Sequence, residues 1–366
     1  MKIGILKETQ KGDHRVAISP LIAKQLISKG FQILVEKQAG IASSYKDSDY
    51  SEVAVEVLER DHIFKDAQIL VKINPFDEDD LKHVASGQVL MSQLYHQASP
   101  KLIEAIAASG ATAFSMDAMP RISRAQDMDV LSSQSNLAGY KAVIKGAYEM
   151  TKIFPLMMTA AGTITPSRVL IYGVGVAGLQ AIATAKRLGA VVEATDIRTE
   201  TKEQAESLGA KFISVDNEGE ASEGGYAKEA SDDYAKRQKE AVDKSLFQAD
   251  LVITTANIPG RKAPVLITKE QVAQMKNGAV IIDLAAAQGG NCELSKLNET
   301  VLVNGVKVLG TTIAPESVAT NASELYAKNM YNFITHLTED NQFKWDLEEE
   351  ITKGTLIVKD GSVLTN

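Results

Sequence analysis

The chain has 366 residues, of which 45% are hydrophobic and 23% charged, and its formal net charge is −8. These values are typical of a folded globular protein, and the length is sufficient for two domains that each bury a core. The acidic balance, without a cluster of Lys or Arg, argues against nucleic acid and anionic lipid as partners. No stretch reaches the roughly 20 apolar residues that cross a bilayer, and the charged first residues are unlike a signal peptide. We therefore expect a cytoplasmic protein.

Cysteine and histidine give no metal prediction. Cys292 is the single cysteine, and the five His residues are scattered without ligand spacing.

In the first third of the chain, short apolar runs alternate with helical patterns. The runs lie at 2–6, 32–36, 67–73, 88–92 and 111–115. Such alternation is typical of a doubly wound α/β domain with a parallel sheet. We predict this N-terminal domain over residues 1–131 and expect the chain to return to it at 321–366, where Asp360-Gly361 predicts a tight hairpin.

A second α/β domain is predicted over residues 132–320. Its expected strands lie at 168–172, 191–195, 211–215, 250–255, 279–284 and 306–310. A connecting helix is expected at 132–154, with Gly139 and Gly146 on one face, where they would allow close packing. The fold class is therefore α/β, with two Rossmann-like doubly wound domains around a nucleotide cleft. The charged stretch 215–241 is either a solvated insertion or a lid that contains Tyr226.

The most informative motif is the turn after the strand predicted at 168–172. Gly173, Gly175 and Gly178 form G-x-G-x-x-G, and a helix is predicted from Val176 and Ala177 onward. In such a motif the first glycine permits the tight turn, the second lets the backbone approach a pyrophosphate, and the third lets helix and strand pack closely. The helix N-terminus then faces the phosphate charge. We therefore predict a dinucleotide site.

An acidic residue follows at the expected distance. Asp196 ends the next predicted strand, where a carboxylate accepts hydrogen bonds from the adenosine ribose and repels a 2′-phosphate. This favours NAD over NADP, a preference that Arg198 slightly weakens. We also assign Ile197 and Arg198, together with Thr255 and Ala256 at the end of the strand predicted at 250–255, to the cofactor contacts.

The densest group of polar residues lies at 120–136, just before the connecting helix. It contains Arg121, Arg124, Gln126, Asp127, Asp129, Ser132 and Ser133. These side chains offer partners for a nicotinamide carboxamide and a phosphate but no obvious proton acceptor. Most NAD dehydrogenases need such a base; His96 and Lys72 are the candidates, and each is equally well explained as a residue without a catalytic role.

Several long segments together identify a family. They are MKIGILKET, PRISRAQ, LSSQSNLAGY, GVGVAGLQAIATAKRLGA, GGYAKE and VIIDLAAAQGGN. Across essentially its whole length the chain resembles the NAD(H)-binding components, called domain I, of proton-translocating nicotinamide nucleotide transhydrogenases.

This resemblance implies roles for specific residues. It implies that Arg121, Gln126, Asp129 and Ser132 orient the nicotinamide. Gln126 would also reach toward a partner component that binds NADP(H), and Tyr226 would lie on a mobile loop that closes on the nucleotide. The implied reaction is direct hydride transfer from NADH to NADP⁺ on the partner, coupled to proton movement through a membrane component. The chain would be a homodimer, peripheral to the inner (plasma) membrane, without direct membrane insertion, and inactive alone.

Two alternatives remain open. An alanine dehydrogenase would use a lysine that matches Lys72, a histidine that matches His96 only after a one-residue shift, and an aspartate where Ala287 stands. A non-catalytic NAD(H) sensor would need only the glycines and Asp196, and the polar segment 120–136 argues against it. After Gly310, Ile313 replaces an Asn that relatives carry, which leaves nicotinamide contacts from that segment open.

Overall fold

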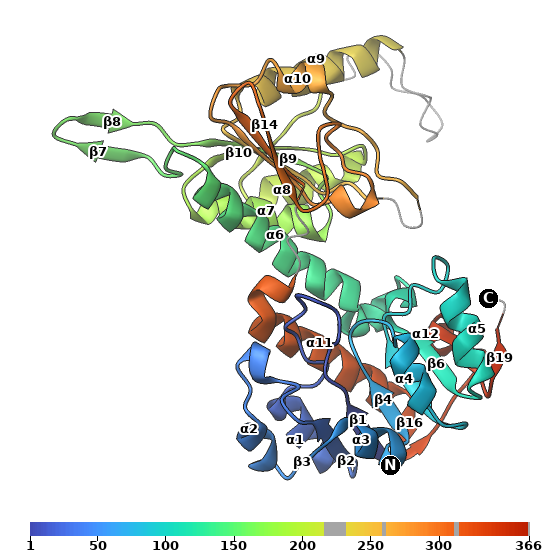
Figure 1. The fold of residues 1–366 in the computed structure, drawn as a ribbon. Coiled ribbons are helices and arrows are strands. Elements are labelled where there is room, and N and C mark those ends of the chain that lie inside the picture. The colour runs from blue at the N-terminus through green and yellow to red at the C-terminus, as the bar shows by residue number, and fades with distance from the viewer. Residues whose placement is uncertain (216–231, 258–260, 311–314, 365–366) are drawn as a thin grey trace. The chain divides into compact units, whose positions relative to one another are not determined.

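The computed structural model describes residues 1–215, 232–257, 261–310 and 315–364. The chain divides into two compact units, Met1–Gln134 with Pro315–Asn366, and Ser135–Ala314 (Figure 1). The first division falls inside helix α6 (Val130–Glu149) rather than at residue 131, and the second falls at 314 rather than 320.

The first unit contains an eight-stranded sheet in the order β19-β18-β6-β5-β4-β1-β2-β3. Six of these strands are parallel: β1 (Lys2–Ile5), β2 (Gln32–Glu36), β3 (Glu56–Leu58), β4 (Ile69–Val71), β5 (Val89–Ser92) and β6 (Thr112–Ser115). Strands β18 (Leu356–Lys359) and β19 (Ser362–Val363) add an antiparallel edge. The strand order reverses between β1 and β4, which makes this pair the topological switch point of the sheet.

Helices cover both faces of this sheet. They are α1 (Pro20–Ser28), α2 (Asp47–Ser51), α3 (Arg60–Asp66), α4 (Glu78–His83), α5 (Pro100–Ala108), α11 (Ala319–His336) and α12 (Glu350–Thr355). Alternate strand residues serve the two faces, because Ile33 and Val35 pack in one core with α1 and α11, whereas Leu34 packs in another with α3 and α5. Burial on both faces explains why these strands read as continuous apolar runs.

The second unit contains a seven-stranded sheet in the order β11-β10-β9-β12-β13-β15-β14. The parallel strands are β9 (Arg168–Tyr172), β10 (Val191–Thr195), β11 (Lys211–Phe212), β12 (Leu251–Thr254), β13 (Val280–Asp283) and β15 (Val306–Gly310), and β14 (Glu299–Val303) runs antiparallel to β15. Helices α7 (Val176–Arg187), α8 (Lys202–Ser207), α9 (Asp232–Gln248) and α10 (Lys269–Val272) connect them. Here the order reverses between β9 and β12. The predicted class of two doubly wound α/β domains is confirmed.

The structure corrects the predicted connecting helix. It spans Val130–Glu149 instead of 132–154. Beyond Glu149 the chain turns toward β9, because Met150 and Phe154 are buried in the core and the Phe154 carbonyl accepts a hydrogen bond from the Ser167 N–H at 3.0 Å.

A hairpin that the sequence did not predict follows this turn. Among the described residues, strands β7 (Met157–Thr159) and β8 (Gly162–Ile164) pair only with each other, and every residue in them is exposed. Figure 1 shows this hairpin extending away from the rest of the second unit. In the first unit, strands β16 (Thr338–Glu339) and β17 (Gln342–Phe343) form another small hairpin.

Candidate nucleotide site

The glycine turn between β9 and α7 has the geometry expected of a dinucleotide motif. Gly173 has φ +92°, and a Cβ there would lie 2.6 Å from the Thr255 hydroxyl oxygen. A Cβ on Gly178 would lie 1.9 Å from the Gly173 carbonyl oxygen, so this glycine lets α7 pack against the strand end. Gly175 differs, because apart from its chain neighbours no heavy atom of the described residues lies within 4 Å of where its Cβ would stand. Space outside the turn is therefore open at Gly175.

Within the part of the chain that the structure describes, the N-terminus of α7 has no side-chain cap. Gly175 is the N-cap residue and forms no side-chain cap hydrogen bond, so a glycine stands where a Ser or Asp would normally satisfy the first amides. Helix α6 packs directly on this turn, since a Cβ on Gly139 would lie 2.1 Å from the Ala177 carbonyl oxygen. The predicted close packing at Gly139 is thus confirmed, while Gly146 packs against Leu251 of β12. An uncapped helix N-terminus beside open space suits a phosphate group.

Asp196 follows β10 and points back to the turn. Its carboxylate accepts hydrogen bonds from the Val174 N–H at 2.7 Å and the Arg198 N–H at 2.9 Å. The Arg198 guanidinium adds two more, at 3.1 and 3.0 Å. Burial acts to raise the pKa of Asp196, but Arg198 and the two backbone amides outweigh it and hold this pKa below its ordinary value. Asp196 is therefore a carboxylate at neutral pH. Ile197, between the two charged residues, is fully exposed.

The segment after β12 lies against the same turn. The Thr255 hydroxyl donates to the carbonyl oxygens of Tyr172 at 3.3 Å and Gly173 at 3.1 Å. The side chain of Asn291 holds Ala256 on both sides, accepting from its N–H at 3.1 Å and donating to its carbonyl oxygen at 2.9 Å. The second unit therefore gathers its predicted cofactor residues at the carboxyl ends of β9, β10 and β12, next to the switch point.

Sequence reasoning missed two residues that support this segment. Asn291 is fully buried, and so is Asp283 at the end of β13. The Asp283 carboxylate accepts hydrogen bonds from the Asn291 N–H at 2.8 Å and from the Thr254 hydroxyl at 3.0 Å. The sequence did contain one indication of Asp283, a single aspartate at the end of the apolar run 280–283. A carboxylate buried at that position needs hydrogen-bond partners.

The four residues predicted to orient the nicotinamide lie in the first unit. They belong to a segment that includes the 3₁₀ helix η3 (Ser123–Met128). Ala125 and Met128 are buried in the core, and the Asp127 carbonyl oxygen accepts amide hydrogen bonds from Asn329 at 2.7 Å and Asn332 at 3.0 Å. The segment is therefore fixed on α11.

Two of the four residues are paired and two are exposed. Asp129 accepts hydrogen bonds from the Ser132 N–H at 2.9 Å and the Ser132 hydroxyl at 2.5 Å, so it caps the start of α6. Arg121 and Gln126 are exposed, and their side chains form no hydrogen bond or ion pair with any residue that the structure describes. Arg124 differs, because its guanidinium lies 3.4 Å from both Glu349 and Glu350.

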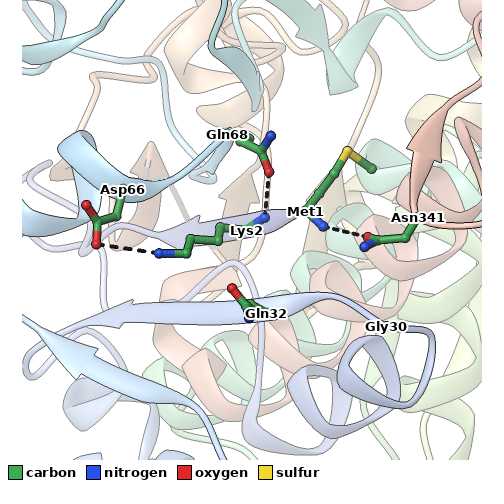
Figure 2. A pocket seen from close by; sticks show the side chains of 7 residues that line it. All are labelled: Met1, Lys2, Gly30, Gln32, Asp66, Gln68 and Asn341. Carbon is green, nitrogen blue, oxygen red and sulfur yellow. Dashed lines mark hydrogen bonds and ion pairs between the residues drawn. The ribbon is translucent and has the colours of Figure 1, made fainter.

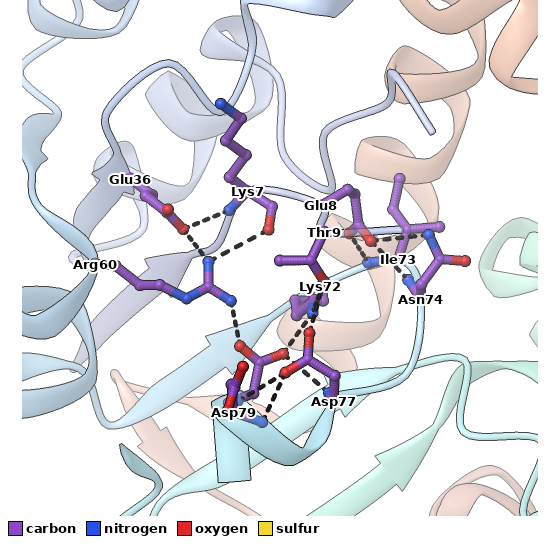
Figure 3. A network of polar contacts seen from close by, with 11 residues as sticks. Lys7, Glu8, Thr9, Glu36, Arg60, Lys72, Ile73, Asn74, Asp77 and Asp79 are labelled. Atoms are coloured by element: carbon purple, nitrogen blue, oxygen red, sulfur yellow. Dashed lines mark hydrogen bonds and ion pairs between the residues drawn. The ribbon is translucent and has the colours of Figure 1, made fainter. Parts of the chain in front are cut away.

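Lys72, the candidate base, belongs to a buried charge network at the switch point of the first unit (Figure 3). It is fully buried, and its ammonium nitrogen lies 2.5 Å from a carboxylate oxygen of Asp80, which also pairs with Arg60. Glu8 beside it accepts from the Ile73 N–H at 2.6 Å, and burial raises the pKa of Glu8. His96 is half-buried, and its Nδ1 has no hydrogen-bond partner among the described residues.

A pocket in the first unit lies away from the strand ends where ligands bind. Its volume is about 410 Å³, and it is lined by Met1, Lys2, Gly30, Gln32, Asp66, Gln68 and Asn341. Figure 2 shows the Met1 amino group hydrogen-bonded to Asn341 and the Lys2 ammonium paired with Asp66. Lys2 and Gln32 are the first residues of β1 and β2, so this is the amino edge of the sheet.

Two predictions lie outside the described residues, the lid with Tyr226 and the segment around Ile313. Within the described ranges, no helix combines the length and apolarity needed to span a membrane. Over the same stretches of the chain, no group of three or more His, Cys, Asp or Glu could hold a metal ion.

Comparison with known proteins decides the family. The pattern for the N-terminal domain of alanine dehydrogenase/PNT matches residues 4–138, and that for the C-terminal domain matches residues 142–366. The chain belongs to the alanine dehydrogenase/PNT family. Its members bind nicotinamide nucleotides, and the two domain patterns together cover nearly the whole chain.

Within this family the chain is similar to transhydrogenase subunits. It is 50% identical to the first portion of the NAD(P) transhydrogenase alpha subunit of Rhodospirillum rubrum, over 100% of this chain and 98% of that protein. A solved structure of transhydrogenase from Sinorhizobium meliloti is 40% identical with a TM-score of 0.92, and each chain is fully covered. Alanine dehydrogenase of Halomonas elongata is 27% identical over 99% of this chain and 94% of its own. The resemblance to transhydrogenase domain I is confirmed.

Proposed function

We propose that this chain is the NAD(H)-binding subunit of a proton-translocating NAD(P)⁺ transhydrogenase. The observation that carries the proposal is the turn from Gly173 to Gly178 with Asp196, which in this structure combines an uncapped helix N-terminus, open space and a carboxylate. The 50% identity to a portion of an NAD(P) transhydrogenase alpha subunit supports it over the full length.

In this proposal the second unit holds the adenosine half and the pyrophosphate of NAD(H). The pyrophosphate lies at Gly175, where the first amides of α7 lack a side-chain cap. The adenosine ribose hydroxyls donate to Asp196, while Thr255 and Ala256 form the far side of the site. A buried Asn291 keeps Ala256 in place, so the site is held before the nucleotide binds.

The first unit supplies the groups that orient the nicotinamide. Arg121 and Gln126 are exposed, whereas Asp129 and Ser132 fix each other at the start of α6. Bound NADH supplies a hydride, which passes from its ring to that of NADP⁺ on the partner component. One C–H bond breaks as the other forms, and no proton is released. The segment 120–136 contains no histidine, and its Asp129 serves as a helix cap, as suits a step without an acid or base.

A buried ion pair argues against an amino-acid dehydrogenase. Lys72 would have to take or give a proton at a substrate, but it is fully buried against Asp80. Ala287 also stands where that enzyme would carry an aspartate. The transhydrogenase assignment is therefore the better supported of the two.

Three partners complete the proposal. An NADP(H)-binding component accepts the hydride, and a membrane-spanning component carries the protons and keeps this chain at the cytoplasmic face of the inner (plasma) membrane. The third is a second copy of the chain, because the hairpin β7–β8 exposes Met157, Met158 and Ile164. An isolated two-stranded hairpin is marginal in water, and an apolar surface on it suits a protein contact.

The proposal is tested by reconstitution. The purified chain is mixed with the NADP(H)-binding component of a known transhydrogenase, and reduction of NADP⁺ by NADH is followed. We expect activity in the mixture and none with either protein alone. Robust activity of the chain alone, or silence of the mixture when NADH binding has been verified, would overturn the proposal.

A further inference from the structure

The carboxylate of Asp196 receives a full set of hydrogen bonds from the protein itself. One oxygen accepts from the Arg198 N–H at 2.9 Å and the Arg198 Nε at 3.1 Å. The other accepts from the Val174 N–H at 2.7 Å and the Arg198 Nη2 at 3.0 Å. A carboxylate offers about four lone-pair sites, so all of them are used.

These four donors differ in how firmly they are held. The two backbone amides are fixed by the fold, since the Gly173 N–H also bonds to the Thr195 carbonyl oxygen at 2.9 Å and ties the ends of β9 and β10 together. The guanidinium belongs to a side chain that is 52% exposed, whereas the carboxylate it holds is 6% exposed. An ion pair with one exposed member contributes little, so the guanidinium is the donor that can leave.

The geometry points to a competition. We propose that Arg198 and the adenosine ribose exclude each other on Asp196, so that Arg198 sets how strongly the site distinguishes NADH from NADPH. This inference rests on the proposed function, because it presumes that a ribose binds there. Two ribose hydroxyls need two acceptor positions, which is the number that the guanidinium occupies.

The displaced guanidinium then affects selectivity. It remains attached two residues from Asp196, near the ribose, where a cation favours a 2′-phosphate. Asp196 repels that phosphate, and the displaced guanidinium offsets part of this repulsion. Asp196 together with Arg198 therefore prefers NADH over NADPH less strongly than Asp196 alone would. For a subunit whose partner binds NADP(H), this preference decides which nucleotide each component carries.

Nucleotide titrations of the full chain, read by the fluorescence of NADH and NADPH, test the competition. In Arg198→Ala the carboxylate keeps its two backbone donors but loses the guanidinium, so NADH should bind about two- to fivefold more tightly than in the wild type, the range of an exposed ion pair. NADPH should not gain, so the ratio of the two affinities should rise. In Asp196→Ala the ribose loses its acceptors and the guanidinium is released, so that ratio should fall at least about tenfold.

A matched control removes a cation elsewhere in the same sheet. Lys211 on β11 pairs with Glu193 at 3.7 Å and is exposed, so Lys211→Ala lowers the charge without touching Asp196. Its affinity ratio should stay at the wild-type value, and thermal unfolding should show all variants folded. Weaker NADH binding in Arg198→Ala, or an unchanged ratio, would overturn the competition while leaving the proposed function intact. If the wild type binds neither nucleotide, both the competition and the proposed function are contradicted.

Discussion

Gly175 and Gly178 stand three residues apart in one turn and are needed for different reasons. A methyl group on Gly178 would collide with the Gly173 backbone, whereas one on Gly175 would enter open space. Gly178→Ala should therefore destabilise the fold by about 1–3 kcal/mol, the cost of overpacking. Gly175→Ala should change the unfolding free energy by less than about 1 kcal/mol but weaken NADH binding, because the methyl group lies where the pyrophosphate would approach. Denaturant unfolding and NADH titration separate the two effects. Equal stability losses in both variants would contradict this account.

Gln126 tests the nicotinamide side of the site. It is exposed and its side chain has no partner among the described residues, so Gln126→Ala should leave the unfolding free energy unchanged and weaken NADH binding only modestly. If the side chain positions the two rings, hydride transfer in the reconstituted mixture should fall roughly 100-fold, as misplacement of reacting groups can cost. Arg124→Ala is the control in the same segment, because Arg124 pairs with Glu349 and Glu350. Full hydride-transfer activity of Gln126→Ala would contradict a role for Gln126 in positioning the two rings.

The buried carboxylate of Asp13 gives a pH dependence with a defined sign. It pairs with Arg15 at 2.6 Å. Burial acts to raise the pKa of Asp13, but the bonds and charge of Arg15 outweigh it, so this pKa is lower in the folded chain than its ordinary value of 3.8. The stabilisation is therefore complete above that value and is lost as the pH falls through the lower folded value, because the unfolded chain takes up the proton first.

Asp13→Asn should accordingly cost about 3–5 kcal/mol at neutral pH, since it removes a carboxylate that pairs with a buried guanidinium. The difference from wild type should shrink below about pH 4. Denaturant unfolding at several pH values measures it. Asp79→Asn removes an exposed pair with Lys82 and should have little effect at any pH. If the difference in unfolding free energy between the wild type and Asp13→Asn stays constant with pH, the lowered pKa of Asp13 is contradicted.

At the level of single residues, the sequence predicted the site where backbone geometry determines the residue type. The glycines and Asp196 could be found because a tight turn and a ribose contact impose fixed spacing. Asn291 could not be found, because its partner Ala256 is 35 residues away and only folding brings them together. The same holds for Lys72, which reads as a surface lysine until Asp80 is seen beside it.

Among the elements, those with a strong apolar run or a turn signal were predictable. The Asp360-Gly361 turn is confirmed, with φ +48° and +78°, between β18 and β19. A similar Asn304-Gly305 signal joins β14 to β15, with φ +48° and +77°, and it was overlooked because β14 is largely exposed. Strand β3 has only three residues, none fully buried, so it carries no periodic signal.

The β7–β8 hairpin yields a prediction about assembly. Met158 is 74% exposed on a hairpin that pairs with no other strand of the described chain. If a second copy covers it, Met158→Asp should shift the chain from dimer to monomer, because burying a charge in an apolar contact is costly. The unfolding free energy of the monomer should not change. Leu302→Asp is a matched control, since Leu302 is 67% exposed on β14. Sedimentation analysis measures both, and a wild-type monomer or a dimeric Met158→Asp variant would contradict the role of the hairpin.

Across the whole molecule, the six parallel strands of each sheet follow the same order, but the two sheets differ at the switch point. In the second unit, the glycine turn and Asp196 leave room for a nucleotide. In the first unit, the acid at the end of β2, Glu36, pairs with Arg60 at 2.5 Å, and Lys72 and Asp80 fill the interior (Figure 3). The shared topology was evident from alternating strand and helix patterns, whereas this difference depends on ion pairs between distant segments.

The proposed function requires that hydride passes directly from NADH on this chain to NADP⁺ on a partner, with no exchange with water. The most direct measurement uses NADH deuterated at C4 in the reconstituted mixture, with mass spectrometry of the NADPH formed. We predict that the transferable deuterium appears in NADPH and that none enters the solvent. Unlabelled NADPH, with deuterium released to water, would contradict the account.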